Sequence, residues 1–217
     1  GPVIGDMACG EYGEGKMSDT IDIFNEIKNF LNHQIKNKKI KALVTAGPTN
    51  EYIDPVRYIT NKSSGKQGYE LAKSLSKRGF ETTLISGPSN LKIDEKINLI
   101  KVETAEEMLK ATQKSLPTDI AIFSAAVADF RIDKQNQDKI KKQQDLTIKL
   151  EKNIDILNYV SNHNSMRPKL VIGFAAETND LIKNAKIKLS SKNCDWIIAN
   201  DVSKKDRGFD SDYNEVT

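Results

Sequence analysis

Four near-continuous apolar runs mark this chain. They are Ile40–Ala46, Asp119–Ala125, Lys169–Ala175 and Asp195–Asn200. A strand that is covered on both faces of a sheet is apolar along its whole length, because neither face meets water. The pattern therefore predicts central strands of a parallel sheet, each followed by small or polar residues.

Segments with helical periodicity alternate with these strands. Strands are predicted over residues 40–46, 80–86, 97–102, 119–124, 146–150, 169–173 and 195–199, and helices over 65–78, 104–115, 153–163 and 178–192. Such alternation is typical of parallel strands joined by crossover helices. We therefore predict an α/β fold, a three-layer Rossmann-like sheet that is mainly parallel and has helices on both faces.

The N-terminal region has a different pattern. Residues 1–17 are rich in glycine, residues 18–35 carry apolar side chains at helical spacing, and residues 36–39 form a polar linker. We expect residues 1–37 to form an appendage with a linker helix. Residues 38–217 are expected to form the main domain.

Composition excludes several classes of protein. Lysine and arginine number 33 and aspartate and glutamate 30, a net charge of +3 that is too balanced to indicate nucleic acid binding. No apolar run approaches the roughly 20 residues that span a bilayer, and the N-terminus lacks a signal-peptide pattern. Two cysteines are too few for a disulfide framework. We expect a cytoplasmic protein that binds neither nucleic acid nor a membrane.

A long loop, Ala46–Gly68, joins the first predicted strand of the domain to the first predicted helix. It brings Gly47, Ser63, Ser64 and Gly65 toward the helix start. Unpaired N–H groups in the first turn, the helix dipole and nearby hydroxyls together suit a phosphate group. An ordinary helix N-cap, with glycines that allow close packing, would use the same residues, and both interpretations stay open.

Arg57 and Asn61 lie in the same loop. An arginine can bind a carboxylate or phosphate through two parallel hydrogen bonds, and an asparagine amide can stabilise a developing oxyanion. Alternatively, both residues fix the loop by hydrogen bonds, as asparagine commonly does in turns. The loop matches neither the Walker A spacing nor G-x-G-x-x-G, so it indicates a nucleotide or phosphorylated substrate bound in another way.

Further candidates follow later strands, where ligands of open α/β sheets bind. Small residues at Ala125 and Ala126 would let a ligand approach the backbone, and Asp129, before Phe130, could reach a ribose, a metal ion or a cap position. Phe174 could wall a base or ribose, or pack in the core.

A basic run, Asp138–Lys142, also follows the strand predicted over residues 119–124. We call it the lysine segment. Lysine is a movable point charge that suits a triphosphate, so Lys139 and Lys142 are candidate ligands. The alternative is an ordinary solvated surface.

Five motifs occur in order along the chain: GPTNEYIDPVRYITNKSSGKQG, SAAVADFR, KIKK, GFAAET and ANDVS. They resemble the phosphopantothenate–cysteine ligases, in particular the ligase half of the bacterial bifunctional phosphopantothenoylcysteine decarboxylase/phosphopantothenate–cysteine ligases. The resemblance runs from about Lys39 to the C-terminus, and it implies a ligase domain over residues 38–217 that is short at its C-terminal end.

Residues 1–17 resemble the end of the flavin-dependent decarboxylase half, and Cys9 matches its active-site cysteine. Taken on chemistry alone, Cys9 is either a proton donor or nucleophile, or an unreactive surface thiol. The flavin-binding segments of that half do not occur in this sequence. The resemblance therefore implies FMN only with a complete decarboxylase domain, and no decarboxylation by this chain alone.

The resemblance implies a two-step reaction in coenzyme A biosynthesis. The carboxylate of 4′-phosphopantothenate attacks the α-phosphate of CTP, which gives an acyl-cytidylate and pyrophosphate, and the amine of cysteine then displaces CMP. Asn61 is implied in the acyl-cytidylate step, Lys139 at the triphosphate, and Arg57 as a third catalytic position. The candidate nucleotide-binding residues are Gly47, Ser63, Ser64, Gly65, Ala125, Ala126, Asp129, Phe130, Lys139, Lys142 and Phe174.

Partners follow from the same resemblance. We expect Mg²⁺ to accompany the triphosphate, with Asp129 as its candidate ligand, and a homodimer that could join the decarboxylase domain in a larger assembly. Two other functions stay open. One is a catalytically silent remnant or assembly subunit. The other is a nicotinamide-dependent Rossmann-like reductase, although the missing G-x-G-x-x-G counts against it.

Overall fold

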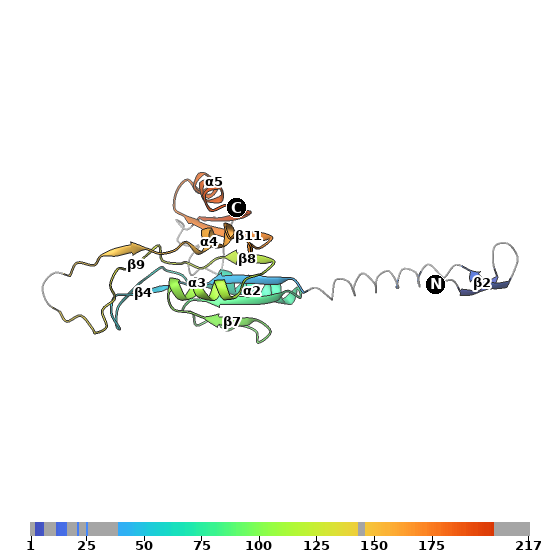
Figure 1. Cartoon of the computed structure of the whole chain (residues 1–217), viewed down its shortest axis with the longest axis horizontal. Coiled ribbons are helices and arrows are strands. Elements are labelled where there is room, and N and C mark those ends of the chain that lie inside the picture. The colour runs from blue at the N-terminus through green and yellow to red at the C-terminus, as the bar shows by residue number, and fades with distance from the viewer. Residues whose placement is uncertain are drawn as a thin grey trace. The chain divides into compact units, whose positions relative to one another are not determined.

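A computed structural model describes residues 3–6, 12–16, 21, 25, 39–142 and 146–201 (Figure 1). The chain divides into two compact units, Gly1–Lys39 and Ile40–Thr217. In the first unit, strands β1 (Val3–Asp6) and β2 (Tyr12–Lys16) form an antiparallel pair. Cys9, and nearly all of the helix expected over residues 18–35, lie outside the described residues.

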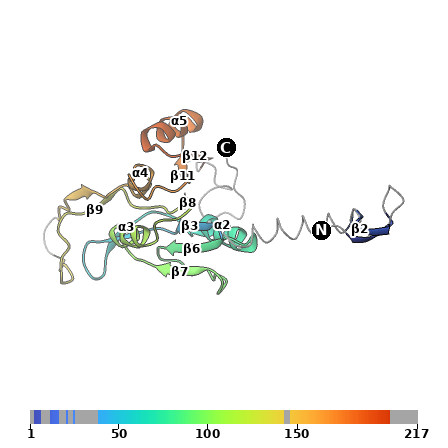
Figure 2. The same ribbon diagram turned by 45° about the vertical axis from the view of Figure 1, so that its right-hand side comes forward.

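The second unit is built on a six-stranded parallel sheet. Its strands are β3 (Lys41–Ala46), β6 (Glu81–Ser86), β7 (Asn98–Lys101), β8 (Ile120–Phe123), β11 (Leu170–Glu177) and β12 (Trp196–Asp201). Figure 2 shows them in the order β12-β11-β8-β3-β6-β7, and every neighbouring pair is parallel. The predicted α/β fold with a mainly parallel sheet is confirmed.

Helices cover both faces of this sheet. They are α2 (Lys66–Lys77), α3 (Ala105–Lys114), α4 (Ile156–Ser161) and α5 (Leu181–Lys192). Leu43 of β3 belongs to the core cluster of α3 and α4, whereas the next residue, Val44, belongs to the cluster that contains Tyr69 of α2. Successive side chains of a strand point to opposite faces, so α2 covers one face and α3 and α4 the other. The three predicted layers are therefore present.

Helix starts follow their capping residues. Thr104 accepts a hydrogen bond from the N–H of Glu107 at 3.2 Å, and Asp155 accepts one from Asn158 at 2.8 Å. A side-chain cap satisfies an N–H group that has no partner within the helix, so it sets where the helix begins. The sequence pattern predicted a helix from residue 153, but because Asp155 is the cap, α4 begins at Ile156.

Two small antiparallel sheets extend the second unit. Strand β4 (Asn50–Tyr52) pairs with β5 (Tyr58–Thr60), and β9 (Phe130–Ile132) pairs with β10 (Leu150–Lys152). Strand β4 also packs beside β9. We call residues 50–60, 130–142 and 146–152 together the arm.

The sequence prediction was wrong in the arm. Residues 46–68 were expected to be a loop, but they contain the β4–β5 hairpin. A strand was expected over residues 146–150, but residues 146–149 are not in a strand. Leu146 is 52% exposed and Leu150 44% exposed, so the alternating apolar side chains of this segment do not face the core. Periodicity predicts a strand only where one face is buried.

No helix among the described residues is long and apolar enough to cross a membrane.

We predict that removing residues 1–37 leaves the second unit folded. The core of the second unit is formed by buried apolar side chains between Ala42 and Ala199, none of which the deletion removes. Circular dichroism should show a cooperative thermal transition close to that of the full chain. Loss of this transition would show that the N-terminal residues belong to the same folding unit.

Candidate functional site

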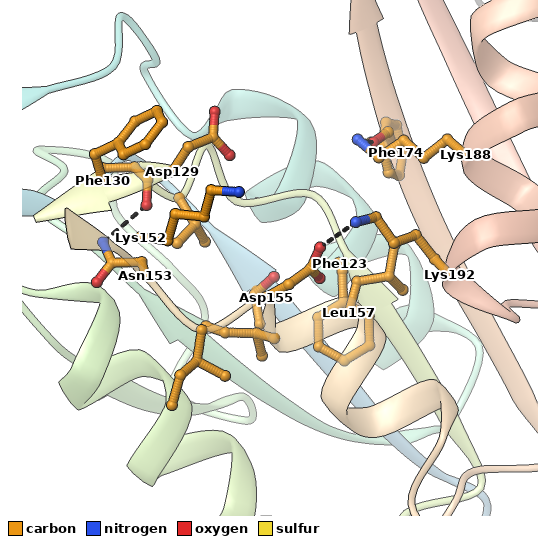
Figure 3. A pocket seen from close by; sticks show the side chains of 15 residues that line it. Phe123, Asp129, Phe130, Lys152, Asn153, Asp155, Leu157, Phe174, Lys188 and Lys192 are labelled. Atoms are coloured by element: carbon orange, nitrogen blue, oxygen red, sulfur yellow. Dashed lines mark hydrogen bonds and ion pairs between the residues drawn. The ribbon is translucent and has the colours of Figure 1, made fainter.

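A pocket of about 400 Å³ opens at the carboxyl end of β8, beside Phe174 of β11 (Figure 3). Its wall also contains residues of β9, β10, α4 and α5. Fifteen residues line it: Thr45, Phe123, Val127, Ala128, Asp129, Phe130, Lys152, Asn153, Ile154, Asp155, Ile156, Leu157, Phe174, Lys188 and Lys192. The position is the one at which open parallel sheets bind ligands.

Charged groups from several elements line the pocket. Lys188 and Lys192 reach it from α5, and Lys152 reaches it from β10 (Figure 3). The Nζ of Lys192 lies 2.6 Å from Asp155 Oδ2, and the Nζ of Lys188 donates to the carbonyl oxygen of Phe174 at 2.8 Å. The lining carries three lysine ammonium groups and only two carboxylates, those of Asp129 and Asp155, so its net charge is positive. A positive lining suits an anionic ligand such as a polyphosphate.

Apart from Thr45 and Asn153, the uncharged part of the pocket wall is apolar. Phe123, Ile156 and Leu157 are buried and belong to the core, whereas Phe174 is half-buried and faces the pocket (Figure 3). Phe130, at the start of β9, is 46% exposed. A ligand that carries both anionic groups and a flat or apolar group would match this lining.

Glycines bring three backbone segments together at the carboxyl end of β3. Gly47 and Gly65 have φ angles of 74° and 80°, which a residue with a side chain rarely adopts. A Cβ at Gly65 would lie 3.1 Å from the nitrogen of Gly47, and a Cβ at Gly68 would lie 2.5 Å from the Cβ of Ala46. Close packing, one of the two interpretations of these glycines, is therefore seen.

Ser63 and Ser64 lie at the start of α2, as predicted. The Oγ of Ser63 accepts from the N–H of Gly65 at 3.3 Å, and the Oγ of Ser64 accepts from Lys66 at 3.5 Å. Helix α2 has Gly65 at its N-cap and no side-chain hydrogen bond there. The two serines thus lie beside the N–H groups to which a phosphate could bind.

Asn61 joins this loop to the segment after β8. Its Nδ2 donates to the carbonyl oxygens of Ala126 at 3.2 Å and Val127 at 3.1 Å. The N–H of Ala126 in turn donates to Gly47 at 2.9 Å. The structure therefore brings Gly47, Asn61, Ala125 and Ala126 together, with the Asn61 amide holding the loop as the alternative interpretation proposed.

Arg57 forms an ion pair with Asp54, which is completely buried. Its Nε donates to Asp54 Oδ2 at 3.0 Å, and its Nη2 also donates to the carbonyl oxygen of Ile140 at 2.8 Å. These hydrogen bonds, together with N–H groups of the backbone, hold the pKa of the Asp54 carboxyl well below its usual range. Arg57 thus contacts the lysine segment, and its guanidinium is engaged by protein groups.

The pocket lining does not contain every residue predicted from the sequence. Asp129, Phe130 and Phe174 line it, but Arg57, Asn61, Lys139 and Lys142 do not. Lys139 and Lys142 are exposed on the arm. Asp129 does not belong to any cluster of three metal-ligating side chains among the described residues.

Sequence reasoning missed the charged and amide residues Lys152, Asn153, Asp155, Lys188 and Lys192 of the pocket, and also Thr45. Lys188 and Lys192 could have been found, because residues four apart lie on the same face of a helix. Lys152, Asn153 and Asp155 follow the misplaced strand, so their position was not visible. Asn153 is fixed by donating from its Nδ2 to the carbonyl oxygen of Ala128 at 2.8 Å (Figure 3).

Known proteins resemble this chain over most of its length. Residues 37–217 match the family described as the DNA/pantothenate metabolism flavoprotein C-terminal domain. The coenzyme A biosynthesis bifunctional protein CoaBC of Haemophilus influenzae is 44% identical over 218 residues, which cover 100% of this chain and 54% of that protein. The chain thus spans about half the length of this relative.

Solved structures agree with the sequence comparison. The crystal structure of the C-terminal domain of a CoaBC protein has 38% identity and a TM-score of 0.66, and the match covers 82% of this chain and 84% of that one. The DNA/pantothenate metabolism flavoprotein from Streptococcus pneumoniae has 26% identity and a TM-score of 0.68, covering 82% and 92%. Sequence and fold therefore agree, and the chain belongs to the family of DNA/pantothenate metabolism flavoprotein C-terminal domains.

Proposed function

We propose that this domain ligates 4′-phosphopantothenate to cysteine in a CTP-dependent step of coenzyme A biosynthesis. The observation that carries the proposal is the lysine-rich pocket at the carboxyl edge of the sheet, in a chain 44% identical to a coenzyme A biosynthesis protein. A triphosphate needs several cationic partners, and this pocket offers three lysines together with the aromatic side chains of Phe130 and Phe174. We also place the reaction in the cytoplasm.

The chemistry proceeds in two displacements. The carboxylate of 4′-phosphopantothenate attacks the α-phosphorus of CTP, and the bond to the β-phosphate breaks as pyrophosphate leaves. The cysteine amine then attacks the activated carbonyl, and CMP leaves as the amide forms. Lys152, Lys188 and Lys192 would neutralise the phosphates, while Phe174 would wall the base or ribose. Phe130 and Asp129 would flank the ribose.

Mg²⁺ fits this site only together with the nucleotide. Magnesium is usually bound by one or two carboxylates plus substrate phosphates, rather than by a cage of protein ligands. Asp129 is one such carboxylate, and Asp155 already pairs with Lys192. We propose that Asp129 holds the ion that accompanies the triphosphate, where the ion would withdraw charge from the attacked phosphate.

The loops at the carboxyl end of β3 would bind the acyl-cytidylate. Asn61 holds the backbone around Ala126, and one of its N–H groups could move to the oxyanion of the second step. The hydroxyls of Ser63 and Ser64 and the N–H groups around Gly65 could donate hydrogen bonds to a phosphate of either substrate. Lys139 and Lys142 would approach the triphosphate from the arm.

Pyrophosphate release tests this function. We expect release that requires 4′-phosphopantothenate and CTP together, and a phosphopantothenoylcysteine product when cysteine is added. CTP should also raise the melting temperature, because a ligand that binds the native state stabilises it. A shift with NADPH instead would favour the reductase, and neither release nor any shift would favour an assembly subunit.

Lys188→Gln should raise the KM for CTP about tenfold or more. A hydrogen bond to a charged group contributes about 1.5–3 kcal/mol, and glutamine keeps most of the side-chain length while it removes the charge. Lys186→Gln is a matched control, since Lys186 is exposed on the same helix and does not line the pocket. Equal effects of the two substitutions would show that α5 does not bind the nucleotide.

Asn61→Asp should slow consumption of the acyl-cytidylate more than it weakens CTP binding. The substitution preserves size but replaces a donor with a negative charge close to a developing oxyanion. Quenched-flow analysis should show the intermediate accumulating. Loss of CTP binding in a thermal shift assay would instead make Asn61 a nucleotide ligand.

We predict a homodimer that forms through the arm. Several apolar side chains there are exposed, and Val56 (57%), Tyr58 (48%) and Leu146 (52%) are among them. Exposed apolar patches of this kind mark protein–protein contacts. Light scattering at micromolar concentration should give about twice 24.3 kDa. A mass of one chain at that concentration would contradict the prediction.

A further inference from the structure

Asp54 is an unusual residue for its position in the arm. It lies between β4 and β5, and its side chain is completely buried. Its Oδ1 accepts from the N–H groups of Val56 and Arg57, both at 2.9 Å. Its Oδ2 accepts from Arg57 Nε at 3.0 Å, from Arg57 Nη2, and from the N–H of Ile140 at 3.0 Å. A buried carboxylate with this many donors is fully satisfied, and it remains charged at neutral pH.

The Asp54–Arg57 pair holds both backbone polar groups of one residue in the lysine segment. Asp54 accepts from the N–H of Ile140, and Arg57 donates to the carbonyl oxygen of Ile140 at 2.8 Å. This pair therefore replaces the hydrogen bonds that a neighbouring strand would supply. The contacts join positions 83 and 86 residues apart in the sequence.

Little else among the described residues fixes this part of the arm. Residues 133–142 and 146–149 form neither helix nor strand. Farther from Ile140, the N–H of Asn136 donates to Ile53 at 3.0 Å, and Asp133 contacts Lys149 through an N–H donor at 3.1 Å and an ion pair at 3.0 Å. The backbone around Ile140 thus depends strongly on the Asp54–Arg57 pair.

Lys139 and Lys141 flank Ile140 and are both exposed. Asp54 and Arg57 neutralise each other, so the lysine charges beside them remain available to an anionic ligand. Lys139 directly precedes Ile140 in the chain. Holding the backbone of Ile140 therefore also restricts the position of the Lys139 Cα, from which the lysine side chain extends. A lysine stem has four rotatable bonds, and a fixed backbone removes part of the entropy lost on binding.

We propose that Asp54 is a positioning residue for the ligation, acting through Arg57 and Ile140 to fix the backbone from which Lys139 reaches the triphosphate. This inference rests on the proposed function of the domain. It assigns to Asp54 a role at a site that it does not touch.

Asp54→Asn is the direct test, because asparagine keeps the shape but not the acceptors. An amide has one oxygen and one nitrogen, and the nitrogen cannot accept these hydrogen bonds. In one orientation it would face the N–H groups of Val56 and Arg57, and in the other those of Arg57 and Ile140. We expect the amide hydrogen of Ile140 to exchange faster with solvent. We also expect the KM for CTP to rise by about as much as in Lys139→Gln, on the order of tenfold.

A double-mutant cycle separates positioning from stability. If Asp54 acts through Lys139, the variant with both Asp54→Asn and Lys139→Gln should have the same KM for CTP as Lys139→Gln alone. Independent effects would multiply instead, which would overturn the inference. Unchanged exchange at Ile140 would also overturn it.

Asp195→Asn is a matched control, because Asp195 lies just before the amino end of β12, whereas the pocket lies toward the carboxyl ends of the strands. Asp195 also pairs with an arginine, accepting from Arg167 Nη2 at 3.1 Å, and it accepts from the N–H of Val171 at 2.7 Å. This variant should lower the melting temperature with no change in the KM for CTP. A comparable rise in KM would show that any loss of stability produces the effect, which contradicts a positioning role.

Ile140→Pro provides a second route if Asp54→Asn does not fold. Of the three backbone N–H groups that donate to Asp54, proline removes only that of residue 140, and it leaves the ion pair with Arg57 in place. The same rise in KM is expected, and an unchanged KM would overturn the inference. Pyrophosphate release by the unsubstituted chain is measured first. Its absence would overturn the proposed function, whereas normal release with multiplying effects would overturn only the role of Asp54.

Discussion

The close approach of backbone segments at the carboxyl end of β3 is the constraint on which the site depends. This strand is central in the sheet, between β6 and β8, and its next residue is Gly47. A Cβ at Gly87, after β6, would lie 1.6 Å from the carbonyl oxygen of Pro48. The N–H of Ala126, after β8, donates to Gly47 at 2.9 Å. Three strand ends are thus fixed to one another before any side chain of the site is placed.

The lysine-lined pocket lies on one side of this junction and takes its charge from elements that follow later in the chain. Lys188 and Lys192 are brought by α5, one turn apart, and Lys152 by β10. Helix α5 packs against β11 and β12, and β10 pairs with β9, so these residues converge although up to 40 positions separate them. Charge at such an edge is partly shielded from water by Phe174 and the core beneath it, which strengthens its effect on an anion.

The arm combines two properties that rarely occur together. Its outer surface carries exposed apolar side chains, while Asp54, a charged residue, is completely buried within it. A buried carboxylate stabilises a structure only when donors surround it, and here Arg57 and three backbone N–H groups do so. The backbone around Ile140 is thus held by polar contacts in a region whose larger apolar side chains are mostly exposed.

Sequence periodicity determined the parallel sheet, its helices on both faces and the edge at which the site lies, because burial on both faces imposes long apolar runs. The motif at residues 46–68 also indicated Gly47, Asn61 and Ser63 as neighbours at the end of β3. Tertiary structure alone decided the arm, since its strands are short and pair as β4 with β5 and β9 with β10 rather than with the six-stranded sheet. It also decided that Arg57 binds Asp54 and Ile140, because a contact across 83 residues has no periodic signal. The position of the pocket lysines of α5 was also decided by tertiary structure. Their spacing predicts that they share one face of a helix, but only the packing of that helix places this face at the pocket.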